Sequence, residues 1–137
     1  MFELDPVLSA DTLKVGDLPL CRVLLMNDSQ YPWLILVPRQ PQLVELTDLS
    51  EDDYLQFCHE SRLVATTMMA HFNGHKMNIA ALGNVVAQLH IHHVVRFPDD
   101  PAWPAPVWGR LPAVKYTPAA AAQQVAQLQA ILFKEQA

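Results

Sequence analysis

Several residue types that mark particular classes of protein are scarce in this 137-residue chain. Its two cysteines, Cys21 and Cys58, form neither a CxxC pair nor a disulfide framework, so a reducing, cytoplasmic location is expected. No apolar run approaches the ~18–20 residues that a membrane span needs. Residues 1–11 are acidic and lack the basic start of a secretory signal. The sequence therefore predicts a protein without a membrane partner.

Basic residues are also few in this chain. Lysine and arginine together number 9, against 14 aspartates and glutamates, which gives a formal net charge of −5 at pH 7. Polymeric nucleic acids need a basic surface, so they are not expected as partners. A small phosphorylated ligand remains compatible, because a local site can hold many hydrogen-bond donors within an acidic protein. With 51% hydrophobic residues, the chain is long enough to form one domain, 1–137, with a real core.

Four apolar segments are expected to form strands: residues 20–26, 33–37, 77–81 and 85–97. The first two flank the turn-forming residues 27–30, which predicts an antiparallel hairpin. Since residues 33–37 are apolar throughout, we expect this strand to be covered on both faces. The last two segments flank Gly83 and Asn84, which predicts a second hairpin with its turn at this pair.

Three helices are expected, at residues 5–13, at 49–74 and within 117–135. Asp5 and Thr117 are each followed by proline, a sequence that suits an N-cap and the first helical position. Ser50 precedes three acidic residues, which favour the positive end of a helix dipole. The long middle helix carries apolar residues at three- and four-residue steps, which marks one buried face.

A segment rich in proline and tryptophan, residues 98–112, separates the last strand from the last helix. Its prolines exclude a helix or an inner strand. Its two tryptophans, Trp103 and Trp108, are too large and apolar to be left without packing partners. We expect this segment either to cover the sheet near the preceding histidines or to join a subunit interface.

Three of the six histidines, His90, His92 and His93, lie within four positions of the last strand. Side chains alternate between the faces of a strand, so residues two apart point the same way. One face is then expected to carry Gln88, His90, His92, Val94 and Arg96. The opposite face is expected to carry Leu89, Ile91, His93, Val95 and Phe97. We interpret His93 as a hydrogen-bonded core residue on this second, apolar face.

Two imidazoles on one face are compatible with more than one chemistry. A neutral imidazole can attack phosphorus as a nucleophile, and it can also bind a metal. Zinc would need at least one further ligand, for which His75 and His93 are the candidates in the sequence. The remaining alternative is that both histidines are simply hydrogen-bonded residues of a half-exposed strand.

Residues 88–94 resemble the signature of the histidine-triad (HIT) superfamily of nucleotide hydrolases and transferases. That signature is His-φ-His-φ-His-φ-φ, where φ is apolar. Gln88 takes the first histidine position, His90 and His92 take the second and third, and His93 takes an apolar position. Gly83-Asn84 is similar to a Gly-Gln pair that precedes the signature, and the resemblance extends over about residues 18–97.

The resemblance implies an α+β fold, in which a long helix packs on an antiparallel sheet of about five strands and a further helix follows. It implies that His90 is the nucleophile and that His92 binds phosphate or the leaving group. Gln88 would hydrogen-bond without titrating. The amides Asn27, Asn78 and Asn84 would bind the nucleotide. Asn27, or Asp28 as a near alternative, would contact the ribose, and the other two amides would contact phosphate or sugar oxygens.

The expected function is therefore a nucleotide hydrolase or nucleotidyl transferase. It would act on the α-phosphate of a nucleoside phosphoanhydride or phosphoramidate, without a cofactor or metal. The resemblance also implies a homodimer with a small nucleotide as substrate. Because the first histidine is absent, a nucleotide-binding regulator with little or no catalysis is one alternative, and a His-x-His metal-binding protein is another.

Overall fold

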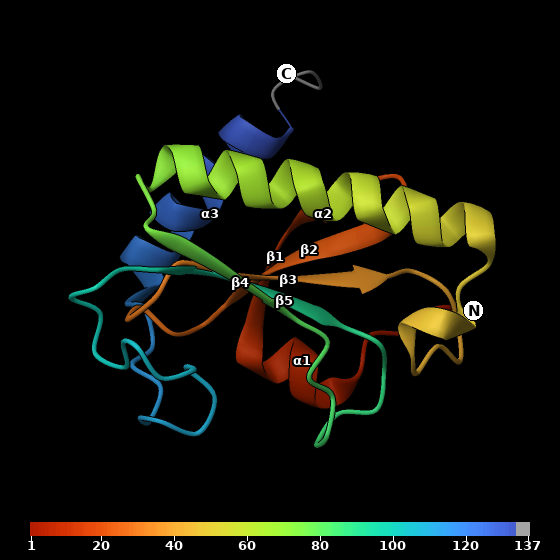
Figure 1. Cartoon of the computed structure of the whole chain (residues 1–137), viewed down its shortest axis with the longest axis horizontal. Coiled ribbons are helices and arrows are strands. Elements are labelled where there is room, and N and C mark those ends of the chain that lie inside the picture. Colours follow the sequence, from red (N-terminus) through yellow and green to blue (C-terminus); the bar gives the residue numbers. More distant parts are fainter. Residues whose placement is uncertain (134–137) are drawn as a thin grey trace.

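The chain folds into an antiparallel sheet of five strands with helices on both sides (Figure 1). The structure, a computed structural model, describes residues 1–133. In chain order its elements are α1 (Pro6–Asp11), β1 (Thr12–Asp17), β2 (Cys21–Met26), β3 (Trp33–Pro38), the 3-10 helix η1 (Leu46–Asp48), α2 (Glu51–His71), β4 (Lys76–Ala80), β5 (Ile91–Arg96) and α3 (Pro118–Leu132). The strand order is β1-β2-β3-β5-β4, which confirms the predicted α+β class.

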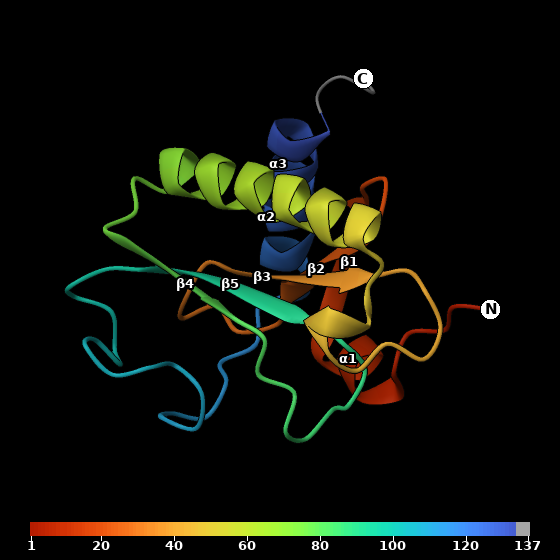
Figure 2. The same cartoon turned by 45° about the vertical axis from the view of Figure 1, so that its right-hand side comes forward.

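The two long helices lie on one side of the sheet, and α1 lies on the other side with the loops that follow β4 and β5 (Figures 1 and 2). No helix within residues 1–133 is both long enough and apolar enough to cross a membrane. Both cysteines are free, Cys21 in the interior and Cys58 at the surface.

The predicted helix starts are confirmed. Asp5, Ser50 and Thr117 each accept a hydrogen bond from a backbone N–H of the first turn of α1, α2 and α3, respectively. The predicted helix at 5–13 was too long, because the chain becomes extended at Thr12 and enters β1. This strand was not expected from the sequence. Of the helix expected within 117–135, residues 134 and 135 lie outside the described residues.

Each face of the sheet has its own apolar core. Under α2 and α3 lie Val23, Leu34, Ile91 and Val95, among others. On the opposite face, Ile35, Val37 and Val94 pack with tryptophan and with residues of α1 and of segment 98–112. Every residue of β3 and β5 is buried, which confirms that residues 33–37 form a strand covered on both faces.

The second hairpin differs from the prediction. Strands β4 and β5 pair antiparallel, as expected, but β5 begins only at Ile91, and residues 81–90 form a long loop instead of a tight turn. Within this loop the chain folds closely on itself at Gly83. A Cβ atom there would meet the Val86 carbonyl oxygen at 2.8 Å, so glycine permits this approach.

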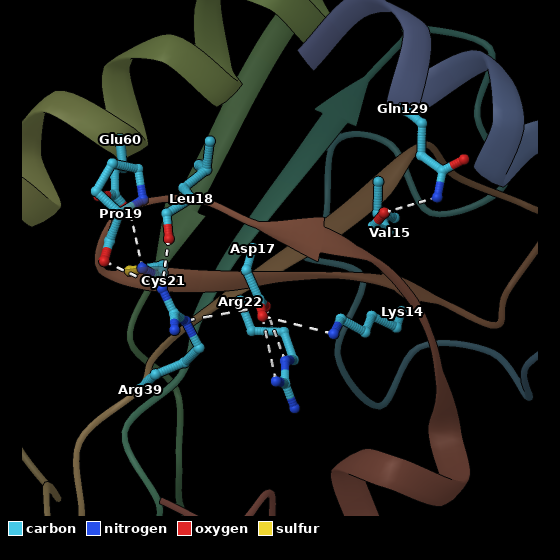
Figure 3. Close-up of polar contacts among 10 residues, drawn as sticks. All are labelled: Lys14, Val15, Asp17, Leu18, Pro19, Cys21, Arg22, Arg39, Glu60 and Gln129. Atoms are coloured by element: carbon cyan, nitrogen blue, oxygen red, sulfur yellow. Dashed lines mark hydrogen bonds and ion pairs between the residues drawn. The ribbon is translucent and has the colours of Figure 1, made fainter. Parts of the chain in front are cut away.

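Polar contacts join α2 and α3 to the sheet (Figure 3). Gln129 of α3 donates to the carbonyl of Val15, at the bulge of β1. The buried carboxylate of Glu60 in α2 accepts the backbone N–H groups of Leu20 at 2.8 Å and Cys21 at 2.7 Å. Gln56 donates a third hydrogen bond to the same carboxylate. Glu60 thus joins α2 to the start of β2.

We predict that Glu60→Ala lowers the free energy of unfolding by about 3 kcal/mol, because two buried backbone N–H groups lose a charged acceptor. Urea unfolding measures the change. His59→Ala, at the neighbouring exposed position of α2, serves as the control and should stay within about 0.5 kcal/mol of the unsubstituted chain. Equal effects of the two substitutions would contradict the role given to Glu60.

Candidate active site

His90 and His92 lie side by side where the loop 81–90 enters β5. Their ring centroids are 4.9 Å apart, and each residue is 5% exposed. Both belong to the face of the sheet that α1 and segment 98–112 cover, because His92 contacts Trp33 and Trp108 of that core. The predicted alternation of faces along residues 88–96 is therefore confirmed for the two histidines.

A cavity of about 320 Å³ adjoins the two rings. Its walls come from α1, the end of β2, Ile35 of β3, the loop 82–86 and Trp108. Most of the lining is apolar, and the polar residues are Asp11, Asn84, His90 and His92. A smaller hollow of about 90 Å³ lies against His90, Asn84 and Gln88. The larger cavity has the size and the composition of a small-molecule site.

Hydrogen bonds with backbone carbonyls and with the Trp33 indole determine which ring nitrogen of neutral His90 and of neutral His92 carries the proton. His90 Nδ1 lies 2.7 Å from the carbonyl oxygen of Gln88, which can only accept, so Nδ1 donates. In neutral His90 the lone pair is then on Nε2. At His92 the roles of the two ring nitrogens are reversed, because the indole N–H of Trp33 donates to Nδ1 at 3.0 Å. The proton of neutral His92 is on Nε2, which is 3.4 Å from the Leu82 carbonyl oxygen.

The neutral form of His92 is strongly favoured. Burial lowers the pKa of His92 to about 4, and the neighbouring His90 adds to the effect. The hydrogen bond to the Leu82 carbonyl opposes it. Near neutral pH, His92 therefore offers an uncharged N–H donor. The adjacent ring of His90 has a lone pair on Nε2 in its neutral form. A ring with a lone pair and an adjacent uncharged N–H donor are groups that nucleophilic attack on a phosphoryl group and binding of its oxygens can use.

His93 points to the opposite face, beneath α2. Its Nδ1 donates to the Ile91 carbonyl at 3.2 Å, and its Nε2 accepts the hydroxyl proton of Ser61 at 2.7 Å. Burial lowers the pKa of His93 to about 4. The interpretation of His93 as a hydrogen-bonded core residue is confirmed, and its ring links β5 to α2.

Gln88 binds the N-terminal segment of the chain. Its Oε1 accepts the backbone N–H of Asp5 at 2.8 Å, and its Nε2 donates to the Glu3 carbonyl at 2.8 Å. These residues precede α1, whose Leu8 lines the cavity. The side chain at the first signature position therefore holds one wall of the cavity in place.

Of the three amides singled out in the sequence, Asn84 alone lines the cavity beside the histidines. The side-chain oxygen of Asn27 accepts the backbone N–H of Tyr116 at 2.9 Å. The side-chain oxygen of Asn78 accepts from the Arg96 guanidinium at 2.9 Å. Both of these oxygens are thus used within the protein.

Segment 98–112 covers the sheet next to the histidines, which is one of the two places expected for it. Arg96 and Asp100 form a buried ion pair at 2.8 Å, and Arg96 also donates to the Ala105 carbonyl. These bonds hold the segment so that Trp108 meets the His92 ring with 5.2 Å between centroids.

Sequence reasoning missed Trp33, Trp108 and Asp11 as residues of the site. One signal was present for Trp33, because an aromatic residue in a strand covered on both faces must pack against its neighbours. Nothing in the sequence pairs it with His92, which is 59 positions away.

The third metal ligand considered in the sequence does not join the histidine pair. His93 is on the other face of β5, and His75 packs against Trp103 with 5.3 Å between ring centroids. Among residues 1–133, no group of three histidine, cysteine or carboxylate side chains is arranged to hold a metal ion. The pair by itself falls short of the donor set that a protein zinc site needs.

Comparison with protein-family models matches residues 8–99 to the HIT domain. The chain belongs to the histidine-triad (HIT) family. Its fold is similar to the solved histidine triad protein from Marinobacter aquaeolei VT8, with 49% identity, 98% of each chain covered and a TM-score of 0.95. The family resemblance carried by residues 88–94 is thus confirmed. No curated protein matches the chain.

Two further histidine triad proteins of known structure are similar over nearly their whole length. The protein from Bradyrhizobium japonicum is 40% identical, with 96% of this chain and 98% of that chain covered and a TM-score of 0.92. The protein from Sinorhizobium meliloti 1021 is 39% identical, with 96% and 97% covered and a TM-score of 0.93. This chain therefore has the complete fold of these bacterial HIT proteins.

We predict that Gln88→Ala frees the N-terminal segment. Loss of the two hydrogen bonds to Glu3 and Asp5 should lower the free energy of unfolding by about 1–2 kcal/mol and speed hydrogen exchange at the Asp5 amide. Gln127→Ala, at an exposed position of α3, is the matched control. Unchanged protection of the Asp5 amide in Gln88→Ala would contradict the assignment.

We also predict that the folded state loses stability as the pH falls from about 6.5 to about 4. The pKa values of His92 and His93 are lowered to about 4, so the unfolded chain, with histidine pKa values of ~6.5, binds protons first. At pH 4.5 the loss should be on the order of 2–3 kcal/mol per histidine relative to pH 7.5.

Urea unfolding at several pH values tests this prediction, and NMR titration of the ring protons assigns the loss to each histidine. Asp17 and Asp100 have lowered pKa values, so the stability that they contribute is lost only below about pH 3.8, outside this range. If His92 and His93 titrate near pH 6.5 in the folded protein, the prediction is wrong.

Proposed function

We propose that this HIT protein hydrolyses or transfers the nucleoside monophosphate group of a nucleoside phosphoanhydride or phosphoramidate, through a covalent intermediate on His90. Membership of the family supports nucleotide binding. One observation carries the catalytic part: the hydrogen bond from His90 Nδ1 to the Gln88 carbonyl, which leaves Nε2 with a lone pair in a residue that lines the cavity.

In the proposed reaction, His90 Nε2 attacks the α-phosphorus in line, and the bond from phosphorus to the leaving group breaks. The leaving group departs with the electron pair. The phosphorylated ring is then cationic and still carries the Nδ1 proton, so its hydrogen bond to the Gln88 carbonyl becomes charge-assisted and stabilises the intermediate. Water then attacks the same phosphorus and releases one proton to solvent. The bond from phosphorus to Nε2 breaks, and its electron pair returns to the ring, which leaves neutral His90 and free nucleoside monophosphate. With an alcohol or amine in place of water, the group is transferred.

His92 would donate its Nε2 proton to a non-bridging phosphate oxygen. Its present bond to the Leu82 carbonyl is long, at 3.4 Å, so exchange for a charged phosphate oxygen is favourable. The amide of Asn84 lies in the same cavity and would bind a second oxygen. Asn27 and Asn78 are proposed as nucleotide ligands from the family resemblance, through the amide groups that their present bonds leave available.

The leaving group receives no proton from Gln88, because an amide does not titrate at accessible pH. Protonation would come from solvent or from the substrate itself. This feature also supports a second candidate function, a nucleotide-binding regulator with little catalysis, since both ends of the Gln88 amide are engaged by residues 3 and 5. In either case we propose, by family likeness, a cytoplasmic homodimer.

We predict that His90→Ala lowers the rate of AMP release from adenosine 5′-phosphoramidate by roughly 10³-fold or more, because no other nucleophile replaces the ring. Chromatographic detection of AMP measures the rate. In the unsubstituted protein, rapid quenching without acid, followed by intact mass measurement, should reveal one adenylyl group per chain, and His90→Ala should lack it. His59→Ala, on the exposed side of α2, is the control and should retain the full rate.

Two outcomes would separate the alternatives. Equal turnover by His90→Ala and the unsubstituted protein would remove the covalent mechanism. Tight AMP binding without turnover of the phosphoramidate or of a diadenosine polyphosphate would favour the regulator.

A further inference from the structure

Trp33 makes a hydrogen bond that bears directly on the chemistry of His92. The residue opens β3, is 5% exposed and packs with Tyr31 in the core of the covered face. Its indole N–H donates to His92 Nδ1 at 3.0 Å, and the two ring centroids are 5.6 Å apart. An indole nitrogen can only donate, so the direction of this bond is fixed.

The direction of the bond determines the tautomer of His92. A neutral imidazole has one N–H group, and a ring that accepts at Nδ1 must carry its proton on Nε2. The opposite tautomer would bring two N–H groups face to face in a buried place and leave both without an acceptor. The Leu82 carbonyl near Nε2 favours the same tautomer, but at 3.4 Å it is the weaker of the two partners.

We propose that Trp33 is a positioning residue, which holds His92 in the Nε2-protonated form so that the ring presents an uncharged N–H donor to the phosphate of the nucleotide. The choice of ligand rests on the proposed function. The effect of Trp33 on the tautomer of His92 is independent of the proposed function, because it is a property of the ligand-free protein. Without the indole N–H, the ring is free to adopt the other tautomer and to present a lone pair, which repels phosphate oxygen.

Trp108 provides a way to separate the hydrogen bond from aromatic packing. It touches the same ring edge-on, with 5.2 Å between centroids. Its own indole N–H has no hydrogen-bond partner among the described residues, so it contributes packing alone to His92. Trp108→Phe is therefore the matched control for Trp33→Phe in any measurement of the tautomer.

The experiment is NMR of uniformly ¹⁵N-labelled protein in its ligand-free form. Long-range proton–nitrogen correlations identify the protonated ring nitrogen of His92, and a scalar coupling across the hydrogen bond from Trp33 Nε1 to His92 Nδ1 detects the contact itself. The expected result is a protonated Nε2 with this coupling in the unsubstituted protein and in Trp108→Phe. Trp33→Phe should lose the coupling and show a mixture of tautomers.

Binding of AMP supplies the second measurement. Trp33→Phe should bind AMP about tenfold more weakly, which corresponds to the loss of one favourable hydrogen bond to phosphate. A shifted tautomer with unchanged AMP affinity would overturn the positioning role, and so would an unchanged tautomer in Trp33→Phe. If that variant does not fold, the spectrum of the unsubstituted protein still decides, because a protonated Nδ1 on His92 overturns the inference.

The two proposals fail in different ways. A protonated Nδ1 on His92 together with normal release of AMP from the phosphoramidate would overturn the role of Trp33 and leave the proposed function standing. Absence of AMP binding by the unsubstituted protein would overturn the proposed function, and with it the ligand assigned to His92.

Discussion

The burial of β5 on both faces is the constraint on which the rest of the structure depends. On one face, beneath α2, His93 accepts a hydrogen bond from the Ser61 hydroxyl. On the other face, His92 accepts a hydrogen bond from the indole N–H of Trp33. A charged imidazole in either place would lose its hydration without gaining an acidic partner, and this is why both pKa values are low. Close packing thus keeps both histidines of this strand uncharged, while the one charged side chain of β5, Arg96, is paired with Asp100.

In the candidate site, the tautomers of the two histidines are set by hydrogen bonds to uncharged groups and not by neighbouring charged side chains. The Gln88 carbonyl, the Trp33 indole and the Leu82 carbonyl each touch one ring nitrogen, and together they give His90 and His92 opposite tautomers. Because these partners do not titrate near neutral pH, each of them favours the same tautomer of its neutral ring whatever the protonation of other groups. A site of this kind is organised before a ligand arrives, which lowers the cost of ordering it during binding.

The sequence was sufficient for features that depend on local patterns. The alternation along residues 88–96 placed His90 and His92 together and His93 apart, and proline and capping residues located the starts of the helices. It was insufficient for β1, which follows α1 without a turn, and for the loop 81–90, whose shape depends on close packing at Gly83. The bond from Trp33 to His92 joins strands that meet only in the folded sheet, so no local pattern reports it.

The two hydrogen bonds of Gln88 have a consequence for how this sequence can change over evolutionary time. A histidine at position 88 would restore the first histidine of the signature, but its rigid ring does not reproduce an amide that binds the backbone of residues 3 and 5 at once. The benefit of that replacement would therefore depend on compensating changes in residues 3–5. We therefore expect substitutions at position 88 and in residues 3–5, which are distant in the chain, to depend on one another.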